Sequence, residues 1–99
     1  MRVSILDAAR DDLIEGFRFY EEKESGLGDY FLSSLYADIE ALKIFFEIHP
    51  KAYKNFHRAL AARFPFAIYY TWDSESVLVR AVVDCRRKPS WIRSHIQAA

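Results

Sequence analysis

Two apolar segments in the C-terminal half, 63–72 and 77–84, constrain the fold of this chain more than any other feature. Both are rich in β-branched and aromatic residues, and the run 73–76 between them consists of turn formers, which predicts a long antiparallel hairpin. The second segment is apolar on both faces apart from Arg80, as expected for a central strand of a sheet that is covered on both faces. On the first segment, alternate residues share one face and are predicted to be core: Phe66, Ile68, Tyr70 and Trp72.

Two amphipathic helices are predicted before this hairpin. Apolar residues recur at helical spacing over 9–20 and again over 32–46, which gives each helix one apolar stripe. Asp7 and Asp29 precede the stripes and are predicted to cap the helix N-termini, and Pro50 ends the second helix. Because only a short loop separates the helices, they should form an antiparallel helical hairpin.

The remaining segments are short. Residues 2–6 are predicted to form a first strand, 51–56 a connector, and 57–62 an edge strand that leads into the hairpin. Pro89 can start a short C-terminal helix. The sequence therefore predicts one α+β domain over residues 1–99. It would contain an N-terminal strand, an antiparallel helical hairpin, a three-stranded antiparallel sheet and a short C-terminal helix, with helices on one face of the sheet.

A formal net charge of zero hides a division of charge between the two halves of the chain. Residues 1–49 hold eleven Asp and Glu against five Lys and Arg, whereas residues 50–99 hold three against nine. Either the C-terminal half presents a cationic surface to an anionic partner, or the two halves neutralise each other within one fold.

The composition also argues against several classes of protein. The apolar runs are too short to span a membrane, there is no glycine-rich phosphate loop, and the histidines stand too far apart to suggest a zinc site. We therefore expect no metal and no cofactor. The start of the chain does not look like a signal peptide, and Cys85 is the only cysteine, which favours a cytoplasmic location. Cys85 itself is expected to be a small buried residue rather than a nucleophile.

Basic residues stand where the strands of the predicted hairpin begin and end. Arg63 precedes the first strand and the run 86–88 follows the second, so their side chains should converge on a phosphate or a carboxylate. The alternative is a solvated run of charge that stops the sheet from pairing further. Trp91 is interpreted either as a lid over the end of the sheet or as an exposed anchor. The candidate site residues are Arg63, Arg86, Arg87 and Trp91, with Lys54, His57, Arg58 and Lys88 as weaker candidates. No catalytic residue is assigned, although the Tyr53, Tyr69 and Tyr70 hydroxyl groups are possible acids or bases.

Short motifs are spread along nearly the whole chain in a recognisable order. They are Tyr20-Glu21-Glu22, Gly26-Leu27-Gly28, Phe31-Leu32, Arg58-Ala59-Leu60, the block Arg63-Phe64-Pro65-Phe66-Ala67-Ile68-Tyr69-Tyr70, Val79-Arg80-Ala81-Val82-Val83, and Arg86-Arg87-Lys88-Pro89 with Trp91. Together they resemble the RelE/ParE toxin superfamily, and most closely its ParE-like, plasmid-stabilisation branch. The fold of that superfamily agrees with the fold predicted from periodicity.

The resemblance implies a growth-inhibiting toxin of a type II toxin–antitoxin system, held inactive by a cognate antitoxin whose extended C-terminal segment wraps it. ParE-like members are taken to block DNA gyrase, without chemistry of their own. RelE-like members cut messenger RNA on the ribosome, with basic residues and often a terminal Tyr or His. RelE-like nucleases carry an Arg where this chain has Phe66, and the only His of the tail is His95. The resemblance therefore favours gyrase binding over endoribonuclease activity, and an inactive antitoxin-binding relative is a third alternative.

The same resemblance suggests how the chain meets its partners. The antitoxin is expected to cover the groove between the helical hairpin and the sheet. Without it, uncovered apolar surface is expected to drive self-association, so a homodimer is a possible state of the chain purified alone.

Overall fold

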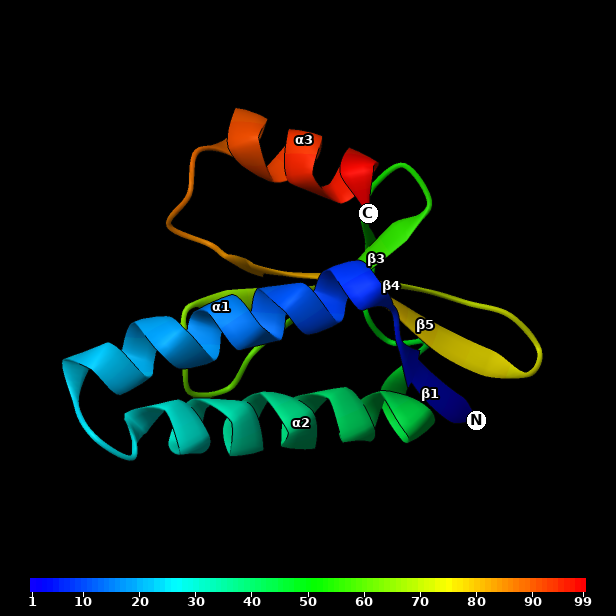
Figure 1. Ribbon diagram of the computed structural model, residues 1–99. Helices are drawn as coiled ribbons and strands as arrows, with labels where there is room; N and C mark the ends of the chain where they lie inside the picture. Colours follow the sequence, from blue (N-terminus) through cyan, green and yellow to red (C-terminus); the bar gives the residue numbers. More distant parts are fainter.

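A computed structural model describes residues 1–99 and shows three helices packed on one sheet (Figure 1). Its elements are β1 (Arg2–Ile5), α1 (Asp7–Lys23), α2 (Leu27–Phe45), β2 (Lys51–Tyr53), β3 (Phe56–Leu60), β4 (Phe66–Trp72), β5 (Ser76–Asp84) and α3 (Pro89–Ala98). None of the three helices has the length and apolar character that a membrane span requires. The α+β class, with a strand, two helices, antiparallel strands and a terminal helix, is confirmed.

One sheet contains all five strands, in the order β1-β5-β4-β3-β2. The hairpin predicted from the two apolar segments is its centre: β4 pairs antiparallel with β5, from Phe66 opposite Asp84 to Trp72 opposite Val77. The N-terminal strand β1 lies parallel to β5 at one edge, with Val3 opposite Val77. β5 is therefore flanked on both sides, as its apolar sequence indicates.

A β-bulge lies in the middle of β5. Tyr69 is opposite Ala81 and Tyr70 is opposite Val79, so Arg80 is an extra residue in the ladder. An extra residue reverses the alternation of side chains between the two faces of a strand. Val79 consequently packs in one core and Ala81 in the other, on the opposite face of the sheet.

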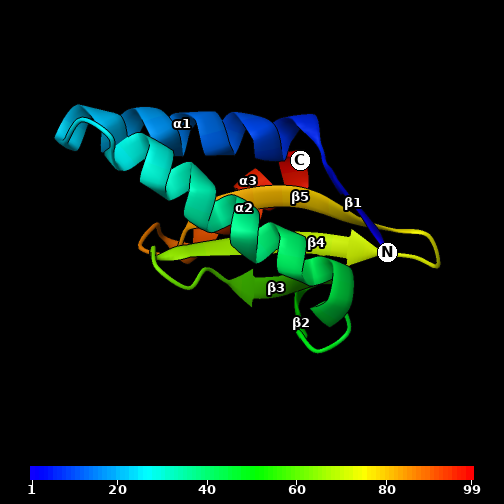
Figure 2. The same ribbon diagram turned by 90° about the horizontal axis from the view of Figure 1, so that it is seen from below.

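The larger core lies between the sheet and the helical hairpin, on the face that we call the near face. α1 and α2 run antiparallel over it, and α2 crosses the strands diagonally (Figure 2). Leu13 of α1 and Phe31 and Leu35 of α2 are almost completely buried there. The helices approach closely at Gly16, where an added Cβ would lie 2.5 Å from the Phe31 ring. A larger residue at position 16 would force the two helices apart.

The opposite, far face of the sheet is covered only in part, by α3. Ile96 is the one fully buried residue of this helix, and it packs with Ala67, Tyr69, Ala81 and Val83. α3 begins at Pro89 as predicted, and proline suits the first turn of a helix because its missing N–H has no partner there. The prediction that the helices share one face of the sheet is wrong for α3, which is too short for its packing face to be read from periodicity.

The segment predicted to be a connector forms the fifth strand instead. β2 pairs with β3 through Lys51 opposite His57 and Tyr53 opposite Phe56. The edge strand of the sheet is therefore β2. Because β2 pairs only with the first residues of β3, the rest of β3 also lies at the edge. Three residues, two of them exposed, give too little pattern for a strand to be predicted.

The helix termini also differ from prediction. Asp7 lies inside α1, whose N-cap is Leu6 without a side-chain hydrogen bond. α2 begins at Leu27 after Gly26, whose φ of 90° lies in the left-handed region that glycine tolerates. The cap comes from the preceding helix, because the Glu21 carboxylate accepts hydrogen bonds from the N–H groups of Gly26 (3.0 Å) and Gly28 (2.9 Å). Asp29 is therefore not the cap.

Two residues predicted to be buried lie at strand ends. Trp72 is the last residue of β4 and is 38% exposed, with its ring 4.8 Å from that of Phe46. Cys85 follows β5 and is exposed. Trp72 ends β4 and Cys85 follows β5, so both lie where the buried pattern of their strands stops.

Candidate functional site

The basic residues singled out by the sequence lie at one end of the sheet. The last residue of β5, Asp84, is opposite the first residue of β4, Phe66, and the N–H of Cys85 donates to the carbonyl of Pro65 (2.8 Å). Register therefore places Arg63, in the β3–β4 loop, at the same end as the β5–α3 loop, residues 85–88. This is the juxtaposition that the strand pairing predicts.

Arg86 is engaged within the protein. Its Nε and one terminal nitrogen donate to the two oxygens of Asp84, at 2.9 and 2.7 Å. The hydrogen bond from Arg86 lowers the pKa of Asp84, and the same bond raises the pKa of Arg86 further above its usual range. A bidentate pair uses the geometry with which a guanidinium grips a phosphate or carboxylate. Arg86 therefore holds the β5–α3 turn and has less capacity for a ligand than its neighbours.

Arg87 and Trp91 belong to a stack of side chains. The Arg87 guanidinium lies 4.2 Å from the centroid of the Trp91 ring, and the same indole stacks on His95, with centroids 4.7 Å apart and planes within 10°. His95 Nε2 is 2.7 Å from Asp12 Oδ1. The indole of Trp91 therefore already has two stacking partners within the protein, although 38% of the residue is exposed.

Asp12 anchors this stack to α1 and to the sheet. Its second carboxylate oxygen accepts a hydrogen bond from the N–H of Val82 (2.9 Å). β1 pairs with β5 only as far as Val79, so the carboxylate satisfies an edge donor that the short strand leaves free. Asp12 is 8% exposed, and this burial raises its pKa, against the opposing effects of the Val82 N–H and His95.

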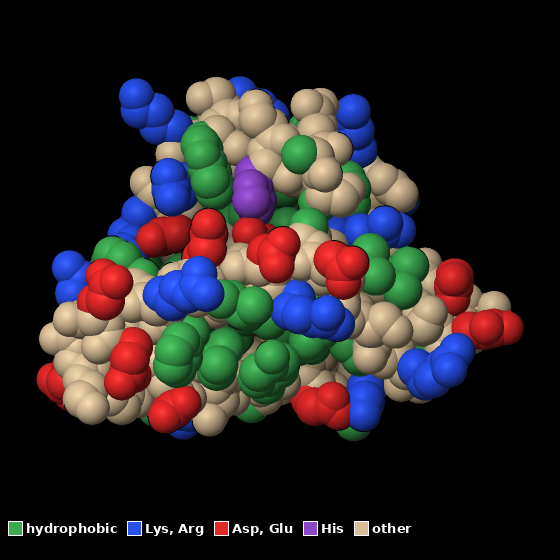
Figure 3. All heavy atoms as spheres, in the orientation of Figure 1, with side chains coloured by type: hydrophobic (Ala, Val, Ile, Leu, Met, Phe, Trp, Pro, Cys, Tyr) green, Lys and Arg blue, Asp and Glu red, His purple; other side chains and the backbone are tan.

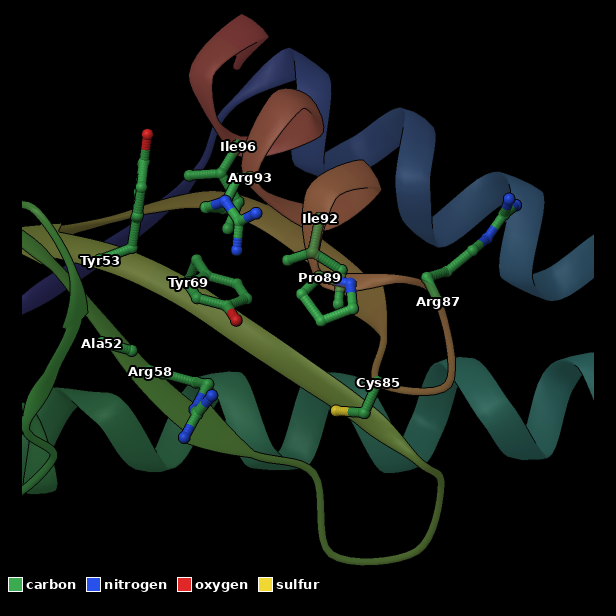
Figure 4. A pocket seen from close by; sticks show the side chains of 10 residues that line it. All are labelled: Ala52, Tyr53, Arg58, Tyr69, Cys85, Arg87, Pro89, Ile92, Arg93 and Ile96. Carbon is green, nitrogen blue, oxygen red and sulfur yellow. The ribbon is translucent and has the colours of Figure 1, made fainter.

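A pocket of about 320 Å³ opens beneath α3 on the far face of the sheet. Figure 4 shows Arg58 of β3 below the Tyr69 ring and Arg93 of α3 above it, whereas the Arg87 side chain turns toward α1. Tyr69, 5% exposed, lies between the two arginines, and Cys85 points into the space from the end of β5 (Figure 4). The full lining is Ala52, Tyr53, Arg58, Tyr69, Cys85, Arg87, Pro89, Ile92, Arg93 and Ile96.

The chemistry of this pocket suits an anion. No carboxylate lines it, and neither Arg58 nor Arg93 forms an ion pair in the protein. Cys85 is exposed as a residue, but partial desolvation of its thiol raises the pKa of that group, which disfavours the thiolate. Unpaired guanidinium groups over an apolar and phenolic floor fit a phosphate or carboxylate attached to a planar or apolar body.

Charge is distributed accordingly between the two sides of the molecule. In the view of Figure 3, which looks onto α1 and α2, Asp and Glu side chains form a row along α1, and hydrophobic side chains gather in the seam between the helices. The unpaired arginines Arg58 and Arg93 lie on the other side, beneath α3 (Figure 4). The acidic residues of the N-terminal half therefore lie along the helical hairpin, and Arg58 and Arg93 of the C-terminal half line the far-face pocket.

The weaker candidates separate into different places. Arg58 lines the pocket, and Lys88 is the exposed N-cap residue of α3. Lys54 occupies the β2–β3 turn, at the opposite end of the sheet from Arg63, with a left-handed φ of 50°. His57 is half-buried on the near face, where its Nδ1 is 2.8 Å from the His49 carbonyl oxygen. Lys54 and His57 therefore do not join the cationic cluster.

Two further residues of the site were missed from the sequence. Arg93 lines the pocket. It lies on α3 one residue after Ile92 and three before Ile96, and this spacing would have predicted that it is on the side of α3 that faces the sheet. Asp12 has no signal in the local pattern, because its partners Val82 and His95 are 70 and 83 residues away along the chain.

Tyr70 is unsuited to acid–base chemistry. Its hydroxyl group donates to the Phe46 carbonyl (2.7 Å), and burial raises its pKa to about 12.

Comparison with known proteins bears on the fold. No family model matches the sequence, and no curated protein matches it. A chain in a solved structure described as the chromosomal ParDE TA system from P. aeruginosa superposes with a TM-score of 0.65. The match covers 85% of this chain and 95% of that chain, at 13% sequence identity. The chain thus shares the fold of a chain from that ParDE system, and the fold expected from the sequence motifs is confirmed.

Proposed function

We propose that this protein is the toxin of a type II toxin–antitoxin pair that works in the cytoplasm by binding its target, with DNA gyrase as that target. The observation that carries the proposal is the fold shared with a chain of a ParDE system over 85% of this chain. Gyrase as the target follows from the resemblance of the sequence motifs to the ParE-like branch.

The pocket beneath α3 is the part of the surface that we assign to the target. Arg58 and Arg93 offer two unpaired cations there, and Arg87 forms the rim beside Trp91. Arg63 and Lys88 extend the positive surface toward the end of the sheet. A carboxylate or phosphate of the target would replace water on these guanidinium groups with bidentate, charge-assisted hydrogen bonds.

The antitoxin is assigned to a different surface, the groove where α2 meets the edge of the sheet. This groove has a volume of about 210 Å³ and is lined by Asp38, Ala41, Leu42, Phe45, Ile48, His49, Ala59 and Leu60. Phe45 is 48% exposed and Ile48 is 69% exposed, so an apolar segment of a partner would cover surface that now faces solvent.

Parallel pulse labelling tests the proposal. The chain is induced without an antitoxin, and thymidine and methionine incorporation are followed in the same culture. We expect thymidine uptake to fall first while protein synthesis is initially spared, and purified protein to inhibit supercoiling by gyrase. Unchanged incorporation of both labels would contradict a toxin role and favour an inactive antitoxin-binding relative.

A second candidate function is cleavage of messenger RNA on the ribosome. It is favoured by one observation: Arg58, Arg93 and the Tyr69 ring converge on a pocket large enough for a phosphate and part of a nucleotide. It predicts that methionine uptake falls first and that transcripts with defined new ends appear. A binding toxin would produce neither result.

A further inference from the structure

Tyr69 is buried, yet its hydroxyl group forms no hydrogen bond within the protein. The residue is 5% exposed and lines the pocket beneath α3, into which the phenol oxygen points (Figure 4). Other tyrosines have found partners: the Tyr70 hydroxyl group donates to the Phe46 carbonyl (2.7 Å), and that of Tyr53 accepts a hydrogen bond from Gln97 Nε2 (2.6 Å). Buried polar groups are normally satisfied, so the Tyr69 hydroxyl group is a donor available to a molecule that enters the pocket.

Strand register and the packing of α3 place two arginines on either side of the Tyr69 ring. Arg58 is directly opposite Tyr69 in the β3–β4 ladder, so both side chains lie on the far face of the sheet. Arg93 lines the pocket from α3, together with Ile92 and Ile96 of the same helix. Neither guanidinium group forms an ion pair within the protein. Two cations and one hydroxyl group therefore share this space.

These groups select the charge of a ligand. A guanidinium group only donates hydrogen bonds, so neither Arg58 nor Arg93 can accept the proton of the Tyr69 hydroxyl group. No carboxylate lines the pocket to accept it either. Two unpaired positive charges match a dianion, whereas a carboxylate or a phosphodiester carries a single negative charge. A phosphomonoester carries a charge of about −1.5 to −2 at neutral pH and has three terminal oxygens, enough for all three donor groups.

The rest of the pocket selects what is attached to the phosphate. The volume of about 320 Å³ exceeds what a phosphate group needs and lies at the lower end of the range for small-molecule sites, which is about 300–1,000 Å³. Tyr53, Pro89 and Ile92 supply aromatic and apolar surface to the same space. This surface fits a planar or apolar body. The pocket therefore has room for a phosphate together with a small body of this kind.

We propose that the pocket beneath α3 binds a free small molecule, a phosphomonoester with a planar or apolar body. Arg58 and Arg93 bind its phosphate, and the Tyr69 hydroxyl group donates to one of the phosphate oxygens. The binding itself does not require the chain to be a toxin. Its consequence rests on the proposed function: because the target is assigned to the same pocket, the phosphomonoester competes with the target and inhibits the toxin.

Isothermal titration calorimetry of the full chain with phenyl phosphate tests the charge requirement. We expect saturable binding at pH 7 that weakens about ten-fold at pH 5, because the second pKa of a phosphomonoester is about 6. The pocket lining has no carboxylate and no histidine, the side chains that ordinarily titrate in this range. Methyl phenyl phosphate, a diester with one negative charge, should bind at least about ten-fold more weakly at pH 7.

Two results of this titration would overturn the proposal. One is the absence of saturable binding of phenyl phosphate. The other is equal binding of the monoester and the diester, which would show that a single negative charge is sufficient, as in the backbone of RNA.

Substitutions test the site within the pocket. Tyr69→Phe removes the hydroxyl group and keeps the ring, so affinity for phenyl phosphate should fall about ten-fold, as for the loss of a hydrogen bond to a charged group. Arg58→Gln and Arg93→Gln should each lower it at least as much. Tyr30→Phe on α2 and Arg10→Gln on α1, both exposed, are the matched controls and should leave affinity unchanged. Circular dichroism establishes that the variants fold, and equal losses in Tyr69→Phe and Tyr30→Phe would reject the site.

Two further measurements identify the source of the phosphate and the consequence of its binding. Adenosine 5′-monophosphate should bind as tightly as a 5′-phosphorylated trinucleotide; a trinucleotide that binds more than about ten-fold tighter would reject a free small ligand in favour of a strand end. Saturating phenyl phosphate should relieve inhibition of gyrase by the chain, and undiminished inhibition would reject competition at the pocket. If the chain does not inhibit gyrase at all, the proposed function fails, and calorimetry still decides whether the pocket binds a phosphomonoester.

Discussion

The two faces of the sheet are built differently. The near face carries α1 and α2, of 17 and 19 residues, over a core of 13 buried residues. The far face carries the 10-residue α3 over a core of five buried residues. Burial of apolar surface is the main favourable term in folding, so the near face supplies most of the stability. The far face leaves room for the pocket with its unpaired arginines, at little cost to the fold.

The largest effect on function should come from removing charge on the far face. Arg58→Ala combined with Arg93→Ala is expected to lower affinity for the target by about a hundred-fold or more, because a hydrogen bond to a charged group contributes about 1.5–3 kcal/mol. Loss of growth arrest on induction and loss of gyrase inhibition are the readouts.

The control for this pair removes the same charge from the helical side. Arg10→Ala combined with Arg18→Ala should leave growth arrest intact, since both residues are exposed on α1. If the two double variants behave alike, net charge matters and the far-face pocket does not.

A core substitution on the near face should affect stability instead. Phe31→Ala is expected to lower the free energy of unfolding by about 3–5 kcal/mol, because it leaves a cavity among residues that relax little. Urea denaturation measures the change. Phe19→Ala, at a ring that is 48% exposed, should change it by less than about 1 kcal/mol. A similar loss in both variants would mean that the near face is not the stabilising one.

Asp12, which links α1 to the sheet and to α3, should show an intermediate effect on the free energy of unfolding. Asp12→Ala leaves the buried N–H of Val82 without an acceptor, which is expected to cost about 1–3 kcal/mol of unfolding free energy. Asp12→Asn keeps an acceptor for that N–H and should cost less. Thermal or urea denaturation of the two variants separates the hydrogen bond from the charge.

The same residue predicts a pH dependence. Burial raises the pKa of Asp12 above its ordinary value of 3.8, so the folded protein binds the proton more tightly than the unfolded chain does. The contribution of Asp12 to the free energy of unfolding is therefore greatest below pH 3.8, and it declines as the pH rises through the raised pKa of the folded state. The stability difference between wild type and Asp12→Asn should decline over that window. A difference that grows with pH would show that the His95 contact, not burial, dominates.

The smallest effect is expected at the tip of the helical hairpin. Glu21→Ala removes the acceptor for the N–H groups of Gly26 and Gly28 and should cost about 1 kcal/mol, as is typical for loss of a helix cap. Denaturant unfolding detects it. Glu22→Ala, an exposed neighbour on the same helix, is the matched control and should be nearly silent.

Local sequence pattern was sufficient to predict the elements in which buried residues recur at a regular spacing. The β4–β5 hairpin, both long helices and the start of α3 at Pro89 follow from periodicity and turn residues, because burial of one face imposes a period on the sequence. β2 was missed because three residues carry no period. The cap at Glu21 was missed because it reaches over a loop, which no pattern within one helix records.

The site was harder to predict than the fold. Sequence placed Arg63, Arg86 and Arg87 correctly at one end of the sheet, since strand pairing brings strand ends together. The sequence did not reveal that Arg86 forms a bidentate ion pair with Asp84, or that His95 stacks on the indole of Trp91. Those contacts depend on the direction of side chains in a loop and on how α3 packs against the sheet. Residue spacing predicts neither of these.

The pairing of β1 with β5 also bears on how the protein is made. Val3 lies opposite Val77, so the first strand emerges from the ribosome long before its partner has been synthesised. At about 5–20 residues per second the wait lasts several seconds, with the apolar stripes of α1 and α2 uncovered meanwhile. Contacts this distant along the chain also slow folding after release. Each newly made molecule therefore passes through an interval in which it is already translated but not yet folded, and a partner that recognises the exposed helices could reach it then.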